Sequence, residues 1–169
     1  MKTLIYILLL CTSFSSFGQA VSKEDFLNDA YTTFIDSAQH TYYLSRGAQS
    51  FMPMADNGFK ALKKQFTGFI DNAILEPMVS KMIADTADQT WDCPKLHNAN
   101  CDFANEYNQK NKIITYYRLS FPVFDDKYQY AIMQVMTICG PQCGNICIFL
   151  FKKTGNHWTA ITSADCAIF

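Results

Sequence analysis

The stretch Ile138-Cys-Gly-Pro-Gln-Cys-Gly-Asn-Ile-Cys-Ile148 decides the fold, because it places a Gly/Pro turn and three cysteines between two apolar runs. The flanking residues are rich in β-branched and aromatic side chains, which favour strands. The pattern predicts strands over about 128–139 and 146–152. A strand over 113–124 is expected before them, and the turn residues Thr154-Gly-Asn156 predict a hairpin into a fourth strand from His157.

The two middle strands are apolar on both of their faces. A sheet with one solvated face would alternate apolar with polar residues. We therefore expect one of two arrangements: N-terminal helices cover one face and another segment covers part of the other, or the sheet curls around its own interior. The opposing sets are Tyr130, Ile132, Met136 and Ile138 against Ala131, Met133 and Val135, and Ile146, Ile148 and Leu150 against Cys147, Phe149 and Phe151.

The first twenty residues have the order of a secretory signal: Lys2, an apolar run of about eight residues, then small residues. Cleavage after Gly18 or after Ala20 fits the small-x-small rule. The run is shorter than the roughly 20 apolar residues of a membrane-spanning helix. We expect a signal peptide at 1–18, or 1–20, no membrane span after cleavage, and an exported protein that is periplasmic or secreted.

Residues 19–169 are expected to form one α+β domain, since about 150 residues suffice for one core and not for two ordinary domains. The prediction is N-terminal helices over 22–84, a cysteine-pinned loop over 85–111 and a four-stranded antiparallel β-meander over 112–169, with the helices packed on the sheet. The loop is expected because 84–111 is rich in Asp and Asn and poor in apolar residues.

Within the helical part, Ser22 and Asp25 form a capping box. Apolar residues every four positions from Phe26 predict an amphipathic helix over about 22–43. A second helix with Phe59, Leu62 and Phe66 inward is expected to end near Gly68, and Pro77 is expected to interrupt the helical pattern that follows.

Six cysteines remain after cleavage, and an even number in an exported chain predicts structural disulfides. Cys93–Cys101 is the favoured local pair. For the others, the hairpin places residue 147 opposite about 164, which favours Cys147–Cys166 with Cys139–Cys143. The alternative is Cys139–Cys147 with Cys143–Cys166. The six residues are Cys93, Cys101, Cys139, Cys143, Cys147 and Cys166.

Other cysteine chemistry is less favoured. Cys139-Gly-Pro-Gln-Cys143 resembles the Cys-Gly-Pro-Cys centre of thioredoxins, but it has one more residue between the thiols and lies between strands instead of before a helix. The 139–147 cysteines lack the distant second pair of the usual zinc pattern. Cys93-x3-His97-x3-Cys101 is another possible ligand set, but Pro94 and the Asn-rich context argue against one helix that places all three on one face. We therefore expect no metal and no cofactor, and keep thiol redox chemistry through Cys139 and Cys143 as an alternative.

Charge and motifs exclude several functional classes. Without Lys2 the chain carries 13 basic and 15 acidic side chains, and no basic run is longer than a pair, so we expect no nucleic-acid partner. The sequence contains no HExxH, GxSxG or phosphate-binding Gly-rich motif, so no catalytic residue is assigned.

The C-terminal half also carries an ordered pattern. Ser120-Phe-Pro-Val-Phe124, Cys139-Gly140 with Cys143-Gly144, Phe149-Leu-Phe-Lys-Lys153 and Trp158 resemble small exported bacterial proteins of unknown function over about 113–169. The order of helices and meander is similar to NTF2-like or cystatin-like α+β folds, in which a curved sheet wraps a helix.

These observations predict an exported, disulfide-stabilised protein of unknown specific role. We expect it to bind a small molecule or a protein, without catalysis, through a helix–sheet cavity or an exposed sheet face. The alternative is an NTF2-like enzyme with its active site in a cavity.

Overall fold

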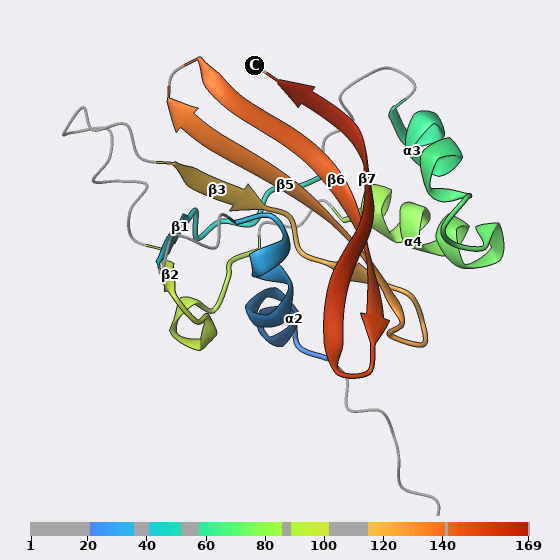
Figure 1. The fold of residues 1–169 in the computed structure, drawn as a ribbon, viewed down its shortest axis with the longest axis horizontal. Coiled ribbons are helices and arrows are strands. Elements are labelled where there is room, and N and C mark those ends of the chain that lie inside the picture. The colour runs from blue at the N-terminus through green and yellow to red at the C-terminus, as the bar shows by residue number, and fades with distance from the viewer. Residues whose placement is uncertain are drawn as a thin grey trace, which may run out of the picture.

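The computed structural model describes residues 21–35, 41–51, 58–85, 89–101, 115–140 and 142–168. The expected signal peptide lies outside these residues. No helix within them is long and apolar enough to cross a membrane. The elements, in chain order (Figure 1), are α2 (Lys23–Ala30), the 3-10 helix η1 (Tyr31–Thr33), β1 (Tyr42–Leu44), α3 (Gly58–Phe66), α4 (Asn72–Ala84), the 3-10 helix η2 (Cys93–Lys95), β2 (Ala99–Asn100), β3 (Tyr116–Leu119), β4 (Val123–Phe124), β5 (Tyr130–Gly140), β6 (Cys143–Thr154) and β7 (His157–Ile168).

The strands form one mixed sheet of seven strands in the order β2-β1-β3-β5-β6-β7, with β4 also paired to β5. β1 runs parallel to both β2 and β3, and the other pairs are antiparallel. The prediction of helices on a four-stranded antiparallel meander, and with it the NTF2-like or cystatin-like architecture, is therefore wrong. The error has a physical cause: β1 and β2 have three and two residues, too few for an alternating pattern.

The central hairpins agree with the predicted strands. β5 and β6 pair from Tyr130↔Lys152 to Gly140↔Cys143, and β6 and β7 pair to Thr154↔His157. Gly155 has φ +62°, a conformation that glycine adopts at little cost in a tight hairpin. The antiparallel meander is thus real, but it forms only part of the sheet.

The strand expected over 113–124 is divided into β3 and β4 by residues 120–122. Pro122 lies in this break, where its missing N–H removes no ladder hydrogen bond. The buried Ser120 hydroxyl accepts a hydrogen bond from the Gln134 N–H at 2.9 Å. The break is therefore tied to β5 through a side chain.

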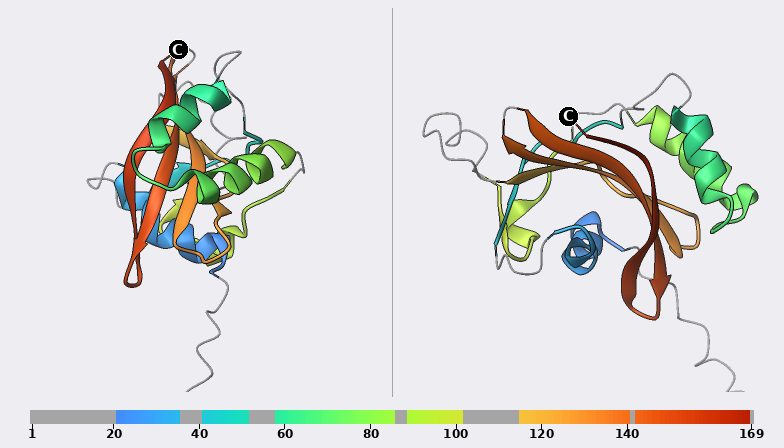
Figure 2. Two further views of the ribbon diagram at one scale, coloured as in Figure 1. Left: turned by 90° about the vertical axis from the view of Figure 1, so that its right-hand side faces the viewer. Right: turned by 45° about the horizontal axis from the view of Figure 1, so that its top comes forward.

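Helices cover both faces of the sheet. Figure 2 shows α2 in the hollow of the curved sheet, whereas α3 and α4 lie on the other side. The N-terminal helices are therefore divided between the two faces, whereas the first predicted arrangement places them on one face and another segment on the other. The core on the α2 side centres on Phe26, Leu27, Tyr42, Leu119, Met133, Val135, Phe151 and Trp158, and the core under α3 and α4 centres on Leu62, Phe66, Leu75, Met78, Met82, Ile132, Ile148 and Leu150.

Helix α2 begins as predicted and ends early. The Ser22 hydroxyl accepts a hydrogen bond from the Asp25 N–H at 3.0 Å, as an N-cap does. The α-helix ends at Ala30 and continues only as η1, so the predicted helix over 22–43 is too long. β-branched Thr32 and Thr33 follow Ala30 and disfavour the α-helix. Residues 36–40 lie outside the described part.

Helix α4 contains Pro77 without a break, so the predicted interruption is wrong. The Asp71 carboxylate accepts a hydrogen bond from the Ala73 N–H at 2.8 Å and caps the helix. Pro77 has no N–H to donate to the Ala73 carbonyl, one turn before it. Packing of Leu75, Met78 and Met82, all buried, offsets that loss.

Candidate functional site

A groove lies between α4 and the turn that joins β4 to β5. Its volume is about 160 Å³. Figure 1 shows α4 directly above this turn at the right of the molecule. The floor is apolar, with Met78 fully buried and Ile74 half-buried, and Ala73 and Pro77 form an exposed wall. The remaining lining residues are Lys81, Asp125, Asp126 and Lys127.

Asp125 builds the turn side of the groove. Its buried carboxylate accepts hydrogen bonds from the backbone N–H groups of Lys127 at 3.1 Å, Gln129 at 2.7 Å and Tyr130 at 2.6 Å. Tyr128, inside the turn, has φ +53°, in the left-handed region that non-glycine residues seldom adopt. The carboxylate thus fixes the turn and is itself occupied by three donors.

The rim of the groove is charged. The Lys81 ammonium on α4 donates to the Asp126 carboxylate at 2.8 Å and joins the helix to the turn. Lys127 is exposed and has no ion-pair partner within the described part of the chain. Two lysines and two aspartates leave the groove without net charge, but Lys127 is the one lysine on the rim that no carboxylate of the described residues neutralises.

The pH range of the Lys81–Asp126 bridge follows from the direction of the Asp126 pKa. The hydrogen bond from Lys81, followed by its charge, holds the pKa of the Asp126 carboxyl below its usual value. A lowered pKa means that the bridge is complete above the ordinary aspartate pKa and is lost as pH falls through the depressed pKa.

We therefore expect the Asp126 carboxyl carbon, followed by NMR, to titrate at lower pH in the wild type than in Lys81→Gln. Lys127→Gln serves as the control and should leave the midpoint nearer to that of the wild type. Equal midpoints in the wild type and Lys81→Gln would contradict this assignment.

The six predicted cysteines form three disulfides and do not line the groove. The bonds are Cys93–Cys101, Cys139–Cys143 and Cys147–Cys166, which is the favoured of the two sets. β7 has two residues opposite Cys147 in a β-bulge, and Cys166 is the second of them. The bulge therefore brings Cys166 closer to Cys147 than the predicted diagonal arrangement.

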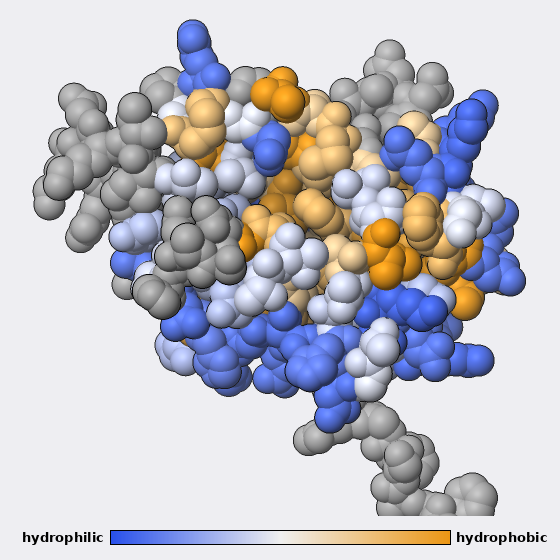
Figure 3. Space-filling view, in the orientation of Figure 1, coloured by the Kyte–Doolittle hydropathy of each residue, from blue (hydrophilic) through white to orange (hydrophobic). Residues whose placement is uncertain are grey.

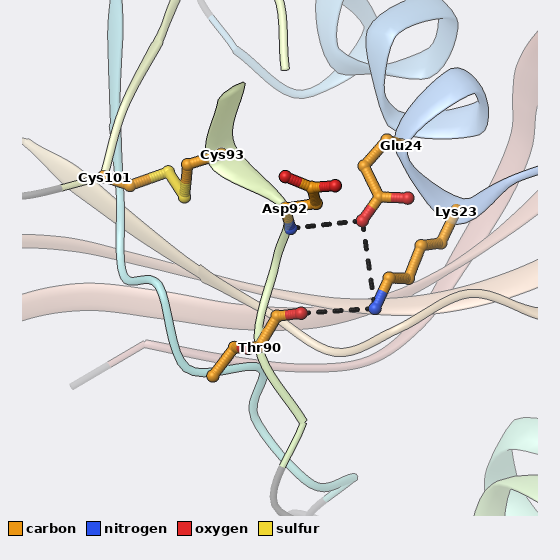
Figure 4. Close-up of a disulfide and its surroundings, with 6 residues drawn as sticks. All are labelled: Lys23, Glu24, Thr90, Asp92, Cys93 and Cys101. Carbon is orange, nitrogen blue, oxygen red and sulfur yellow. Dashed lines mark hydrogen bonds and ion pairs between the residues drawn. A yellow bond between two sulfur atoms is a disulfide. The ribbon is translucent and has the colours of Figure 1, made fainter. Parts of the chain in front are cut away.

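The Cys93–Cys101 bridge lies beside the first turn of α2 (Figure 4). The Glu24 carboxylate, almost fully buried, accepts a hydrogen bond from the Asp92 N–H at 3.2 Å and lies 3.8 Å from the Lys23 ammonium. Lys23 also lies 3.5 Å above the centre of the Phe121 ring. These charges are satisfied by one another and by the backbone, so the cluster fixes the loop to α2.

A His–Asp pair lies at the β6–β7 hairpin. His157 Nδ1 is 2.9 Å from an Asp29 carboxylate oxygen, and the other oxygen accepts the Trp158 N–H. The His157 side chain is 81% exposed, so nothing encloses a substrate beside it. The pair attaches the hairpin to α2. Within the described residues, no group of three or more His, Cys, Asp or Glu side chains could hold a metal ion.

An exposed apolar band is the other surface of note. Figure 3 shows apolar side chains along the middle of the face seen in Figure 1, over β6 and β7 and beside α3, with hydrophilic side chains below. Phe69, Ile83 and Ile168 are the large apolar residues that are most exposed among those described.

The groove could not be predicted from sequence patterns, because its residues come from two segments about 45 positions apart. Pro77 and the stretch Asp125-Asp-Lys127 are the signals that the sequence offers, and neither of them alone indicates a groove. Comparison of the chain with family models finds no matching family, and neither the curated proteins nor the solved structures show a significant match. The resemblance to small exported bacterial proteins therefore stays a prediction.

Proposed function

We propose that the protein is an extracytoplasmic binding protein that holds a small amphiphilic carboxylate in the groove between α4 and the β4–β5 turn. The observation that carries the proposal is the combination, in one groove, of an apolar floor and an unpaired lysine. Ligand sites are typically concave and mostly apolar, with a few polar groups that fix orientation.

The volume of the groove limits the size of the apolar part of the ligand. A cavity of about 150 Å³ accommodates benzene. The groove, at about 160 Å³, matches a ring or a short branched or linear chain of that size. Met78 suits such a floor because its flexible, polarisable side chain adapts to the shape that it meets.

The charged side chains of the groove determine which polar group of the ligand is favoured. The Asp125 carboxylate is occupied by three backbone donors and Asp126 by Lys81. Lys127 remains to pair with an anion, so a carboxylate at the rim gains an ion pair that an alcohol or an amine does not. An exposed pair of this kind contributes roughly 0.2–1 kcal/mol, or about a 1.4- to fivefold difference in affinity.

Binding is favoured over catalysis because of what lines the groove. Among the described lining residues there is no serine, cysteine, histidine or tyrosine, so no nucleophile lies beside a general base there. The aspartates hold structure, and neither is placed to exchange protons with an apolar ligand.

Export is supported by two independent features, the signal-like N-terminal stretch and three disulfides, which persist in oxidising compartments. We expect the mature chain, purified from the secreting cell, to begin at Gln19 or Val21 by mass spectrometry. A mature chain that still begins at Met1 would contradict export with cleavage.

The head group provides the test of binding. Isotope-labelled protein is titrated with hexanoate, hexanol and hexylamine, and amide shifts are followed in α4 and in residues 125–130. Hexanoate should bind most tightly and hexylamine least, and Lys127→Gln should abolish the preference for hexanoate over hexanol. Lys60→Gln, on exposed α3, is the matched control and should keep that preference. Equal binding of all three compounds, or amide shifts elsewhere alone, would refute the proposal.

A further inference from the structure

The Cys139–Cys143 disulfide differs from the Cys93–Cys101 bridge in exposure and from both other bridges in its place in the fold. Cys143 is exposed and Cys139 is half-buried, whereas Cys101 in the first bridge is buried. The third bridge has the same exposure, with exposed Cys166 and half-buried Cys147. Only in Cys139–Cys143 do both sulfurs belong to the turn end of one hairpin. Figure 1 shows that end at the top of the sheet, far from α2 and α4.

Its topology differs as well. The bridge closes a sequence separation of 4, against 8 and 19 for the others, so it restrains the least of the unfolded chain. The ladder pairs Ile138↔Gly144 and Thr137↔Asn145 hold the hairpin beneath it. Opening this bridge therefore leaves β5 and β6 paired.

From this we infer that Cys139–Cys143 is a thiol–disulfide exchange site for a dithiol protein, independent of the ligand groove. A partner thiolate attacks the Cys143 sulfur, the more exposed of the two, and the bond between the two sulfurs breaks. Cys139 leaves as a thiolate that takes a proton from water. The second thiol of the partner then attacks the mixed disulfide, which releases Cys143 as a thiol. The partner is oxidised by two electrons and the hairpin is reduced by two.

The surroundings favour a protein partner over a small anionic thiol. Residues 128–151 contain no Asp, Glu, Lys, Arg or His. The hairpin therefore carries no cation of its own to attract glutathione, which is an anion. Exposed Gln142 and Asn145 offer uncharged hydrogen-bonding groups to a protein that docks on the turn.

Timed reduction tests the inference. The oxidised protein is treated with limiting dithiothreitol, free thiols are alkylated, and peptides are mapped by mass spectrometry. Cys139 and Cys143 should be labelled at least tenfold faster than the other four cysteines, with no change in the circular dichroism spectrum. Cys139→Ser/Cys143→Ser should lose this fast phase, and Cys147→Ser/Cys166→Ser should keep it.

A second arm separates exchange with a protein from simple accessibility. Thioredoxin with its reductase and NADPH is the dithiol protein probe, and glutathione is the anionic comparison. At equal thiol concentration, thioredoxin should reduce Cys139–Cys143 at least tenfold faster than dithiothreitol, and glutathione should be slower than both. The inference is overturned if another bridge opens first, if all three open together with unfolding, or if thioredoxin is no faster than dithiothreitol.

Discussion

Replacing Phe26 by Ala should lower the free energy of unfolding by about 3–5 kcal/mol, the range for removing a fully buried aromatic side chain. Phe26 is 0% exposed and links α2 to three strands. Its ring makes edge-on contacts with Phe124, Phe151 and Trp158, at centroid distances of 5.4, 5.1 and 5.1 Å. The loss combines the transfer of the ring to water with a cavity that the rigid sheet cannot fill.

Urea unfolding followed by circular dichroism measures this effect. Phe69→Ala is the matched control, because that side chain is 50% exposed. We expect its change to stay within about 0.5 kcal/mol, as for other surface substitutions. Similar losses for the two variants would mean that α2 does not fill the hollow of the sheet as described.

The second large effect is expected at Asp125. Asp125→Ala removes the acceptor of three backbone N–H groups around a turn that contains the left-handed Tyr128. We expect a loss of about 3 kcal/mol, since hydrogen bonds to charged groups contribute about 1.5–3 kcal/mol each and water replaces part of them. Asp125→Asn should recover only part of it, because the amide replaces one acceptor oxygen by a donor.

Asp126→Asn is the control for this position. The neighbouring carboxylate is 87% exposed and bonds only to Lys81 among the described contacts, so the change should be small. Asp125→Ala should also shift the amide resonances of Lys127, Gln129 and Tyr130 strongly. If the two aspartates prove equally tolerant, the turn is not held by Asp125.

The parts of the fold that follow from local patterns could be predicted. Ser22 caps α2, Gly155 turns the β6–β7 hairpin, and both middle strands are apolar on two faces because helices cover both. The hairpin geometry favoured the observed disulfide pairing over the alternative Cys139–Cys147 with Cys143–Cys166. Each of these features depends on residues close in sequence or on a strong periodicity.

The remaining features depend on long-range contacts. β1 pairs with β3, more than 70 positions later, through only Tyr43↔Tyr116 and Leu44↔Tyr117. Such a short parallel strand leaves no pattern in the sequence, and Tyr42 was therefore assigned to a helix. Pro77 was interpreted as a break because propensity disfavours it, whereas buried packing of α4 outweighs the missing hydrogen bond. The groove depends on the second of these features, because the continuous helix α4 forms one of its two sides.

The central claim is that a ligand binds between α4 and the β4–β5 turn. Direct contacts between a bound ligand and the residues of the groove test this claim most directly. Intermolecular nuclear Overhauser effects are measured on the labelled protein with bound hexanoate. The account predicts contacts from the hexanoate methyl to the methyl groups of Ile74 and Met78, which form the floor. Contacts confined to other apolar surface, such as Phe69 or Ile168, would contradict it.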